Sequence, residues 1–112
     1  MLLLCLKLGG IDVKKLFISQ PMRGLTDEEI LKTREEICIK AEKTIGEPVE
    51  LIQSFFEDFK PIGNIPVAYL GKSISLLAEA DVAYFGDGWK DARGCKIEHE
   101  VAVQYGIDRI ED

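Results

Sequence analysis

The chain has 112 residues, of which 46% are hydrophobic and 30% are charged, a composition typical of one globular domain with a single core. The formal net charge of −6 disfavours a nucleic acid polymer as a partner, because such a partner usually requires a basic face. The three cysteines are widely spaced and odd in number, which is typical of reduced cytoplasmic thiols rather than disulfides. Because there is a single histidine and no Cys-x-x-Cys pair, we expect no metal site, and we expect no other cofactor.

The first twelve residues form a segment of their own in this interpretation. Residues 1–8 are mostly apolar and are followed by Gly9 and Gly10. The apolar run is far shorter than the roughly 20 residues of a spanning helix, and it lacks the basic start and the cleavage site of a signal peptide. We therefore expect an extra N-terminal segment over 1–12, either frayed or added as an edge strand. We also expect a single domain over 13–112, a cytoplasmic location and no membrane association.

Strand and helix patterns alternate from residue 13 onward, which predicts an α/β domain with a parallel sheet. Strands are predicted over 13–19, 49–54, 81–85 and 107–110. Right-handed crossovers and a strand order near 2-1-3-4 give a flavodoxin-like three-layer sandwich of four or five strands. In such sheets ligands bind beyond the carboxyl ends of the strands, where the strand order reverses. We therefore expect the site between the loops 20–24 and 86–94, which leave the first and third strands.

Three helices are predicted between these strands. The first begins after Thr26, which forms a capping box with Glu29, and ends before Gly46. The second opens at Pro66, and the third covers residues 94–105. Their apolar stripes are predicted to contain Ile30, Ile37, Cys38, Ala41 and Ile45 in the first helix, and Val67, Leu70, Ile74 and Leu77 in the second.

The third helix carries a carboxylate, Glu98, on its predicted buried face. That face also holds Cys95, Ile97, Val101, Ala102 and Tyr105, whereas Lys96, His99, Glu100 and Gln104 take the opposite, solvated face. An inward carboxylate is costly unless it is paired or hydrogen-bonded. Glu98 is therefore either a buried residue satisfied by core groups or a functional acid at the floor of a pocket. Gly94, one turn earlier, favours the second interpretation because it lets a ligand approach the backbone closely.

Three stretches together resemble the nucleoside 2-deoxyribosyltransferase-like superfamily. They are Ser-Gln-Pro-Met at the end of the first strand, Ala-Asp-Val-Ala-Tyr in the third strand, and Asp-x-x-Gly-Cys-x-x-Glu-x-x-x-Ala-x-x-x-Gly over 91–106. The resemblance covers roughly residues 14–108 and is closest to a small uncharacterised branch found in bacteria and their phages. Its most specific feature is the spacing of Gly94, Glu98, Ala102 and Gly106.

The resemblance implies that Glu98 is the nucleophile that attacks the anomeric carbon of a deoxyribose. Its place near a helix N-terminus is expected to help keep the carboxylate ionised. Asp91 approximates the aspartate at the head of the family's motif and would serve as acid/base or as an anchor of the base. Ser73 stands where many relatives have an aspartate that handles the base, so another donor, Asp91 or a water, would protonate the leaving group.

The loop over 20–24 lies where relatives have a glycine-rich loop around the sugar, and Gln20 replaces a common glycine of that loop. Its run Met22, Arg23 and Gly24 is similar to an Ile-Arg-Gly run on the 5'-phosphate side in deoxynucleotide hydrolases. Ser19 and Arg23 are expected to hold sugar or phosphate, because a guanidinium suits phosphate by geometry and by charge.

Three functions follow from these observations. The leading expectation is cleavage or transfer of the N-glycosidic bond of a (deoxy)nucleoside or its 5'-monophosphate, with carboxylate chemistry as in glycoside hydrolysis. Trp89 would then stack on the base, unless it only anchors its loop. The second is a non-catalytic binder of nucleotides or ADP-ribose-like ligands, which Ser73 favours. The third is a scaffold for an oligomer, in which Glu98 is a satisfied core residue. Sites completed by neighbouring subunits among the relatives imply a homodimer or a larger homo-oligomer.

Overall fold

The computed structural model describes residues 13–54 and 58–112 and gives an α/β domain with a parallel sheet. The sheet has the order β2-β1-β3-β4, and each neighbouring pair of strands is parallel. Its strands are β1 (Lys14–Ser19), β2 (Val49–Leu51), β3 (Val82–Phe85) and β4 (Asp108–Glu111). This order confirms the predicted one and is consistent with a flavodoxin-like fold. The predicted N-terminal segment lies outside the described residues.

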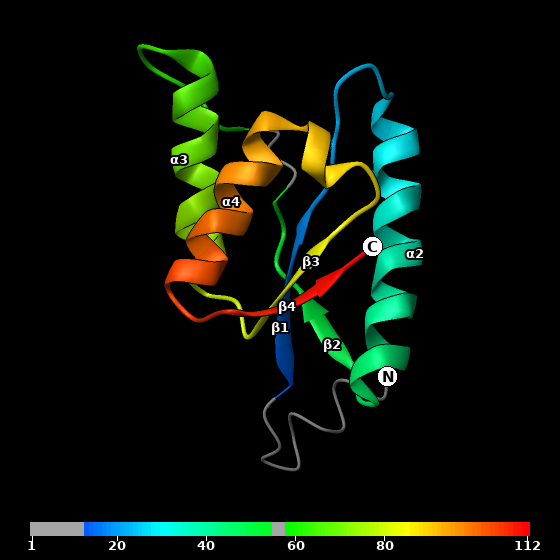
Figure 1. The fold of residues 1–112 in the computed structure, drawn as a ribbon. Helices are drawn as coiled ribbons and strands as arrows, with labels where there is room; N and C mark the ends of the chain where they lie inside the picture. The colour runs from blue at the N-terminus through cyan, green and yellow to red at the C-terminus, as the bar shows by residue number, and fades with distance from the viewer. Residues whose placement is uncertain (1–12, 55–57) are drawn as a thin grey trace.

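Helices lie on both sides of this sheet (Figure 1), with α2 (Asp27–Ile45) on one side and α3 (Ile65–Leu77) and α4 (Arg93–Gln104) on the other. Each side has its own buried cluster. Leu16 and Ile18 of β1 pack with residues of α2, whereas Phe17 packs with residues of α3 and α4. Successive strand residues point to opposite faces of a sheet. The continuous apolar run of β1 is therefore explained by burial on both faces, as is usual in parallel sheets.

The first helix begins and ends as the sequence predicts. The Thr26 hydroxyl accepts from the Glu29 N–H at 3.1 Å, and the Glu29 carboxylate accepts from the Thr26 N–H at 2.9 Å. Gly46 ends the helix with a φ of 82°, a left-handed conformation that glycine adopts without strain. The predicted stripe is confirmed by the burial of Ile30, Ile37 and Ala41.

The second helix differs from its prediction. Its N-cap is Asn64, whose side chain accepts from the Val67 N–H at 3.2 Å. Of its thirteen residues only Leu77 is buried, and Val67 is 61% exposed. The predicted inward stripe is therefore wrong at Val67, because the N-terminal half of α3 borders a pocket and solvent rather than the core.

The third helix also has a narrower buried stripe than predicted. Cys95, Glu98 and Ala102 are buried, but Ile97 and Tyr105 are exposed. Positions three and four residues apart share one face of a helix, and Cys95, Glu98 and Ala102 form such a row on α4, beside which His99 also contacts Phe85 of β3. Within residues 13–54 and 58–112, no helix is long and apolar enough to cross a membrane.

Candidate functional site

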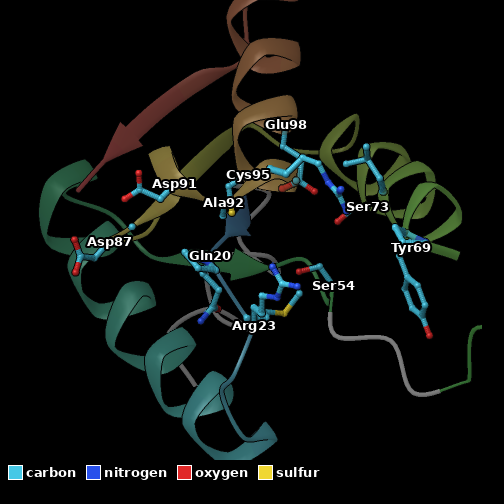
Figure 2. Close-up of a pocket in the computed structure, with 17 residues that line it drawn as sticks. Gln20, Arg23, Ser54, Tyr69, Ser73, Asp87, Asp91, Ala92, Cys95 and Glu98 are labelled. Atoms are coloured by element: carbon cyan, nitrogen blue, oxygen red, sulfur yellow. The ribbon is translucent and has the colours of Figure 1, made fainter.

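A pocket of about 970 Å³ opens at the carboxyl ends of β1, β2 and β3 and has the size of a small-molecule site. Figure 2 shows its side chains. The lining comes from the segment after β1, Ser54 in the segment after β2, helix α3, the 87–92 loop with the 3₁₀ turn η1 (Trp89–Asp91), and the start of α4. The lining residues are Gln20, Pro21, Met22, Arg23, Ser54, Pro66, Tyr69, Leu70, Ser73, Asp87, Gly88, Asp91, Ala92, Arg93, Gly94, Cys95 and Glu98.

Glu98 lies on the wall of the pocket that α4 forms, and it is 93% buried from solvent (7% exposed). The Ser19 hydroxyl, at the end of β1, donates to Glu98 Oε1 at 2.6 Å. Burial raises the pKa of Glu98, whereas hydrogen bonds from Ser19 and Ser73 and the positive charge of Arg34 act in the opposite direction. Glu98 is the sixth residue of α4, beyond the first turn in which a helix end acts strongly. The predicted help from the helix N-terminus is therefore replaced by these side chains.

The predicted residues of the first loop separate into two groups. Gln20, Met22 and Arg23 line the pocket. Ser19 does not line it and reaches it through Glu98. Gly24 lies outside the lining and has a φ of 81°, inside a turn in which the Leu25 N–H donates to the Met22 carbonyl at 3.2 Å. Gly24 thus serves the turn that leads into α2 rather than the wall of the pocket.

Gln20 is a second polar side chain fixed in the wall. It is 6% exposed, and its Oε1 atom is buried without a hydrogen-bond partner. A Cβ atom added at Gly86 would lie 3.4 Å from the Gln20 Cβ and 3.3 Å from Ile37 Cδ1. The glycine after β3 therefore lets Gln20 pack closely against the sheet end.

Trp89 is placed in the core and not in the lining of the pocket. Its ring stacks on His99 with centroids 4.0 Å apart and a tilt of 23°, and it contacts Phe85 at 5.6 Å. His99 is half-buried and its Nε2 lies 2.6 Å from Glu111 Oε2, so its predicted place on the solvated face is corrected. Of the two roles predicted for Trp89, the geometry favours the loop anchor over the base platform, because the ring is already covered by these partners.

Asp91, Ser73 and Gly94 do line the pocket. Figure 2 shows the Asp91 carboxylate turned away from Glu98, with Cys95 between the two residues in this view. The side chain of Ser73 acts to lower the pKa of Glu98 against the effect of burial. A Cβ added at Gly94 would meet no atom within 4 Å, so the packing of the protein does not itself require glycine there.

Sequence reasoning missed Arg34 and Ser54. Arg34 lies four residues after Ile30 and three before Ile37, on the buried stripe of α2, and it is 4% exposed. Its Nη1 donates to Ser54 Oγ at 2.8 Å. The available signal was a charged residue on an otherwise apolar stripe, the same signal that identified Glu98. Ser54 carries no such signal in the sequence, because only the folded chain places this residue next to Arg34.

A family model described as "Domain of unknown function (DUF4406)" matches residues 14–110. The chain belongs to this family. Comparisons with curated proteins and with solved structures gave no significant match. The DUF4406 domain therefore contains the whole sheet up to Ile110, with the three helices and the pocket.

Proposed function

We propose that this DUF4406 protein cleaves or transfers the N-glycosidic bond of a (deoxy)nucleoside or nucleoside 5'-monophosphate. The observation that carries the proposal is the buried Glu98 carboxylate, which is held by Ser19 at 2.6 Å and lines a pocket of nucleotide size. Parallel sheets of this kind bind their ligands beyond the carboxyl ends of the strands. A carboxylate at that end is therefore in position to contact a bound ligand. The resemblance to nucleoside 2-deoxyribosyltransferases supports the same chemistry.

In the proposed reaction a Glu98 oxygen forms a bond to the anomeric carbon while the bond from that carbon to the base nitrogen breaks. The base leaves with the bonding electron pair and takes a proton from a water or from Asp91. A water or a second base then attacks the anomeric carbon, the bond from that carbon to Glu98 breaks, and the attacking group gives its proton to the group that protonated the leaving base, as in retaining glycoside hydrolysis. Because Asp91 is exposed and faces away from Glu98, we favour a water as the proton source.

Arg23 is proposed to bind the 5'-phosphate when the ligand is a monophosphate. Its side chain is exposed and lines the pocket, so it reaches a ligand without the cost of burying a charge. An arginine binds phosphate with two parallel hydrogen bonds as well as by charge.

The experiment is base release, followed by chromatography, across deoxynucleosides, ribonucleosides and their 5'-monophosphates, with and without a second free base. Release that requires a second base indicates transfer, and release without one indicates hydrolysis. The Glu98→Gln variant is the control, because it keeps the volume of the side chain and removes its charge. Absence of base release across the panel would overturn the proposal.

A non-catalytic binder of nucleotides or ADP-ribose-like ligands is the second candidate. Ser73 favours it, because this residue lines the pocket and provides no carboxylate for the base. Burial also raises the pKa of Glu98, which lowers the fraction of this carboxyl group that is ionised and can act as a nucleophile. Thermal stabilisation of the wild-type protein by a nucleotide, with no base release, would identify this function.

We propose in addition that the protein forms a homodimer or a larger homo-oligomer. Apolar side chains at and before the start of α3 are exposed: Ile62 is 90%, Ile65 53% and Val67 61% exposed. An apolar cluster of this kind is often an interface. Light scattering at micromolar concentration tests the assembly, and a monomer would contradict it.

A further inference from the structure

The 87–92 loop forms one wall of the pocket, and groups outside the loop fix its place. Four of its residues line the pocket: Asp87, Gly88, Asp91 and Ala92. Backbone hydrogen bonds within the loop are short-range ones, such as the donation from the Ala92 N–H to the Trp89 carbonyl at 3.2 Å. At the start of the loop, the Asp112 carboxylate accepts from the Asp87 N–H at 3.1 Å. The side chain of Trp89 is the buried anchor in its middle.

Trp89 is held by contacts between aromatic rings. It is 8% exposed, and its indole N–H is buried without a hydrogen-bond partner. The ring stacks on His99 with centroids 4.0 Å apart, and Phe85 contacts both rings, at 5.6 Å from Trp89 and 4.9 Å from His99. Because no acceptor among the described residues meets the indole N–H, these ring contacts decide where Trp89 lies. The position of the His99 ring therefore bears on the whole loop.

His99 is itself tied to the sheet. Its Nε2 lies 2.6 Å from Oε2 of Glu111, so a side chain of α4 is bonded to one of β4. This hydrogen bond lowers the pKa of Glu111, and a bond to an ionised carboxylate is stronger than one between neutral groups. A phenylalanine would also stack on Trp89, and it would need no polar partner. The bond to β4 is what the histidine adds, so packing alone does not account for a histidine at this position.

We propose that His99 is a positioning residue of the pocket: Glu111 fixes its ring, the ring holds Trp89 by stacking, and Trp89 sets the 87–92 wall. The proposal concerns the shape of the pocket and goes beyond the proposed reaction, none of whose steps it requires. A proton on His99 strengthens the same link, because an imidazolium is attracted by the Glu111 carboxylate and by the face of an indole ring.

Charged groups from three elements surround the stacked rings. Glu111 belongs to β4, as does Arg109, whose Nε lies 3.6 Å from Glu111 Oε2. Lys90 of η1 has its Nζ 5.7 Å from the centre of the Trp89 ring. On α4, Lys96 is exposed one turn before His99, and β3 contributes the uncharged Phe85. Glu111 is thus the carboxylate that pairs with His99 in this cluster.

The first test uses the single tryptophan and the single histidine of the chain. Tryptophan emission reports Trp89 alone, and the imidazole signals in proton NMR report His99 alone. A stacked imidazolium quenches indole fluorescence, so the emission should fall as the pH falls, with the same midpoint as the His99 signals. In His99→Phe, which keeps an aromatic ring, the emission should not change over that range. Wild-type emission that does not follow the titration of His99 would overturn the proposal.

The second test breaks the bond to β4 and measures amide hydrogen exchange at one pH. Glu111→Ala should raise the exchange rates of the Asp91 and Ala92 amides by about tenfold, as expected for one lost charged hydrogen bond. The amides of β1 and β3 should keep their rates. Glu111→Gln retains an acceptor oxygen and should give a smaller rise.

The matched control for this test is Gln104→Ala. It removes another side chain of α4 that bonds a carboxylate, since Gln104 Nε2 donates to Glu100 Oε2 at 2.7 Å, but it does not touch the loop. The exchange rates in the loop should stay at the wild-type value. Three outcomes would overturn the proposal: no rise in Glu111→Ala, an equal rise in the loop and the sheet, or the same rise in Gln104→Ala.

The third test connects the wall to a ligand, with 2'-deoxynucleoside 5'-monophosphates as probes. For those that stabilise the wild-type protein thermally, Glu111→Ala should weaken binding by up to about tenfold, and Glu111→Gln by less. Unchanged affinity for all of them would overturn the role of His99 in positioning the pocket. If none of them binds the wild-type protein, the proposed nucleotide chemistry fails, whereas the emission and exchange results still decide whether His99 sets the loop.

Discussion

The floor and the rim of the pocket differ in how their charges are held. On the floor, Glu98 is 7% exposed and is held by Ser19, and the lining residue Ser54 accepts a hydrogen bond from Arg34, which is 4% exposed and lies outside the lining. On the rim, Arg23, Asp87 and Asp91 line the same space but are exposed to solvent. A fixed, desolvated charge acts strongly on a neighbouring group, whereas an exposed charge is screened. The floor is therefore suited to chemistry on the ligand, and the rim to its recognition.

The largest effect should come from the floor. Glu98→Gln should reduce base release by orders of magnitude while ligand binding survives, because the lost interaction belongs mainly to the transition state. The free energy of unfolding should hold or rise, since a buried charge is removed. Turnover is measured by chromatography and stability by denaturant titration. A loss of stability of roughly 1–3 kcal/mol, as for a broken buried hydrogen bond, would instead indicate a structural glutamate.

The loop that carries the rim residues Asp87 and Asp91 depends on Trp89. Trp89→Ala should lower the stability of the domain by about 3–5 kcal/mol, because a buried aromatic ring is replaced by a cavity. Tyr105→Ala is the matched control, since Tyr105 is 80% exposed, and it should change stability by less than about 0.5 kcal/mol. Chemical denaturation measures both. A Trp89→Ala variant with normal stability but weak nucleotide binding would indicate instead that Trp89 stacks on the base.

A change at the rim should affect ligand binding and leave the fold intact. Arg23→Ala should weaken the binding of a 5'-monophosphate by about tenfold and the binding of the matching nucleoside far less. Only the monophosphate has a phosphate group that the guanidinium can bind. Its melting temperature without ligand should match that of the wild-type protein. Calorimetric titration with the two ligands checks the difference. Equal losses for both would assign Arg23 to structure or to an interface.

The smallest effect, and the sharpest test of the floor, is the pH dependence of stability. The pKa of Glu98 is raised in the folded protein, so the folded state binds more protons than the unfolded state between the ordinary glutamate pKa and the raised one. Stability contributed by this group is therefore present at low pH and is lost as the pH rises through the folded pKa. The difference in unfolding free energy between the wild-type protein and Glu98→Gln should fall with rising pH over that range. A difference that does not depend on pH would contradict the burial of an ionisable Glu98.

Much of the fold was determined by local sequence patterns. The capping box of Thr26 and Glu29, the glycine at 46 and the apolar run of β1 are short-range signals, and each is present as predicted. The alternation of elements with right-handed crossovers then fixed the strand order. The inward position of Glu98 followed from the helical period in the same way.

Only the tertiary structure decided which side chains meet Glu98. Ser19, Arg34 and Ser73 lie on three different elements, and their distance from Glu98 depends on how α2, β1 and α3 pack around the sheet end. The helical period of α3 predicted Val67 as a core residue, but the N-terminal half of this helix borders the pocket and solvent rather than the core. Trp89 is likewise covered by His99, a residue that the helical period assigned to solvent. The helical period predicts which residues lie on the same face of a helix. Only the packed structure shows what that face contacts.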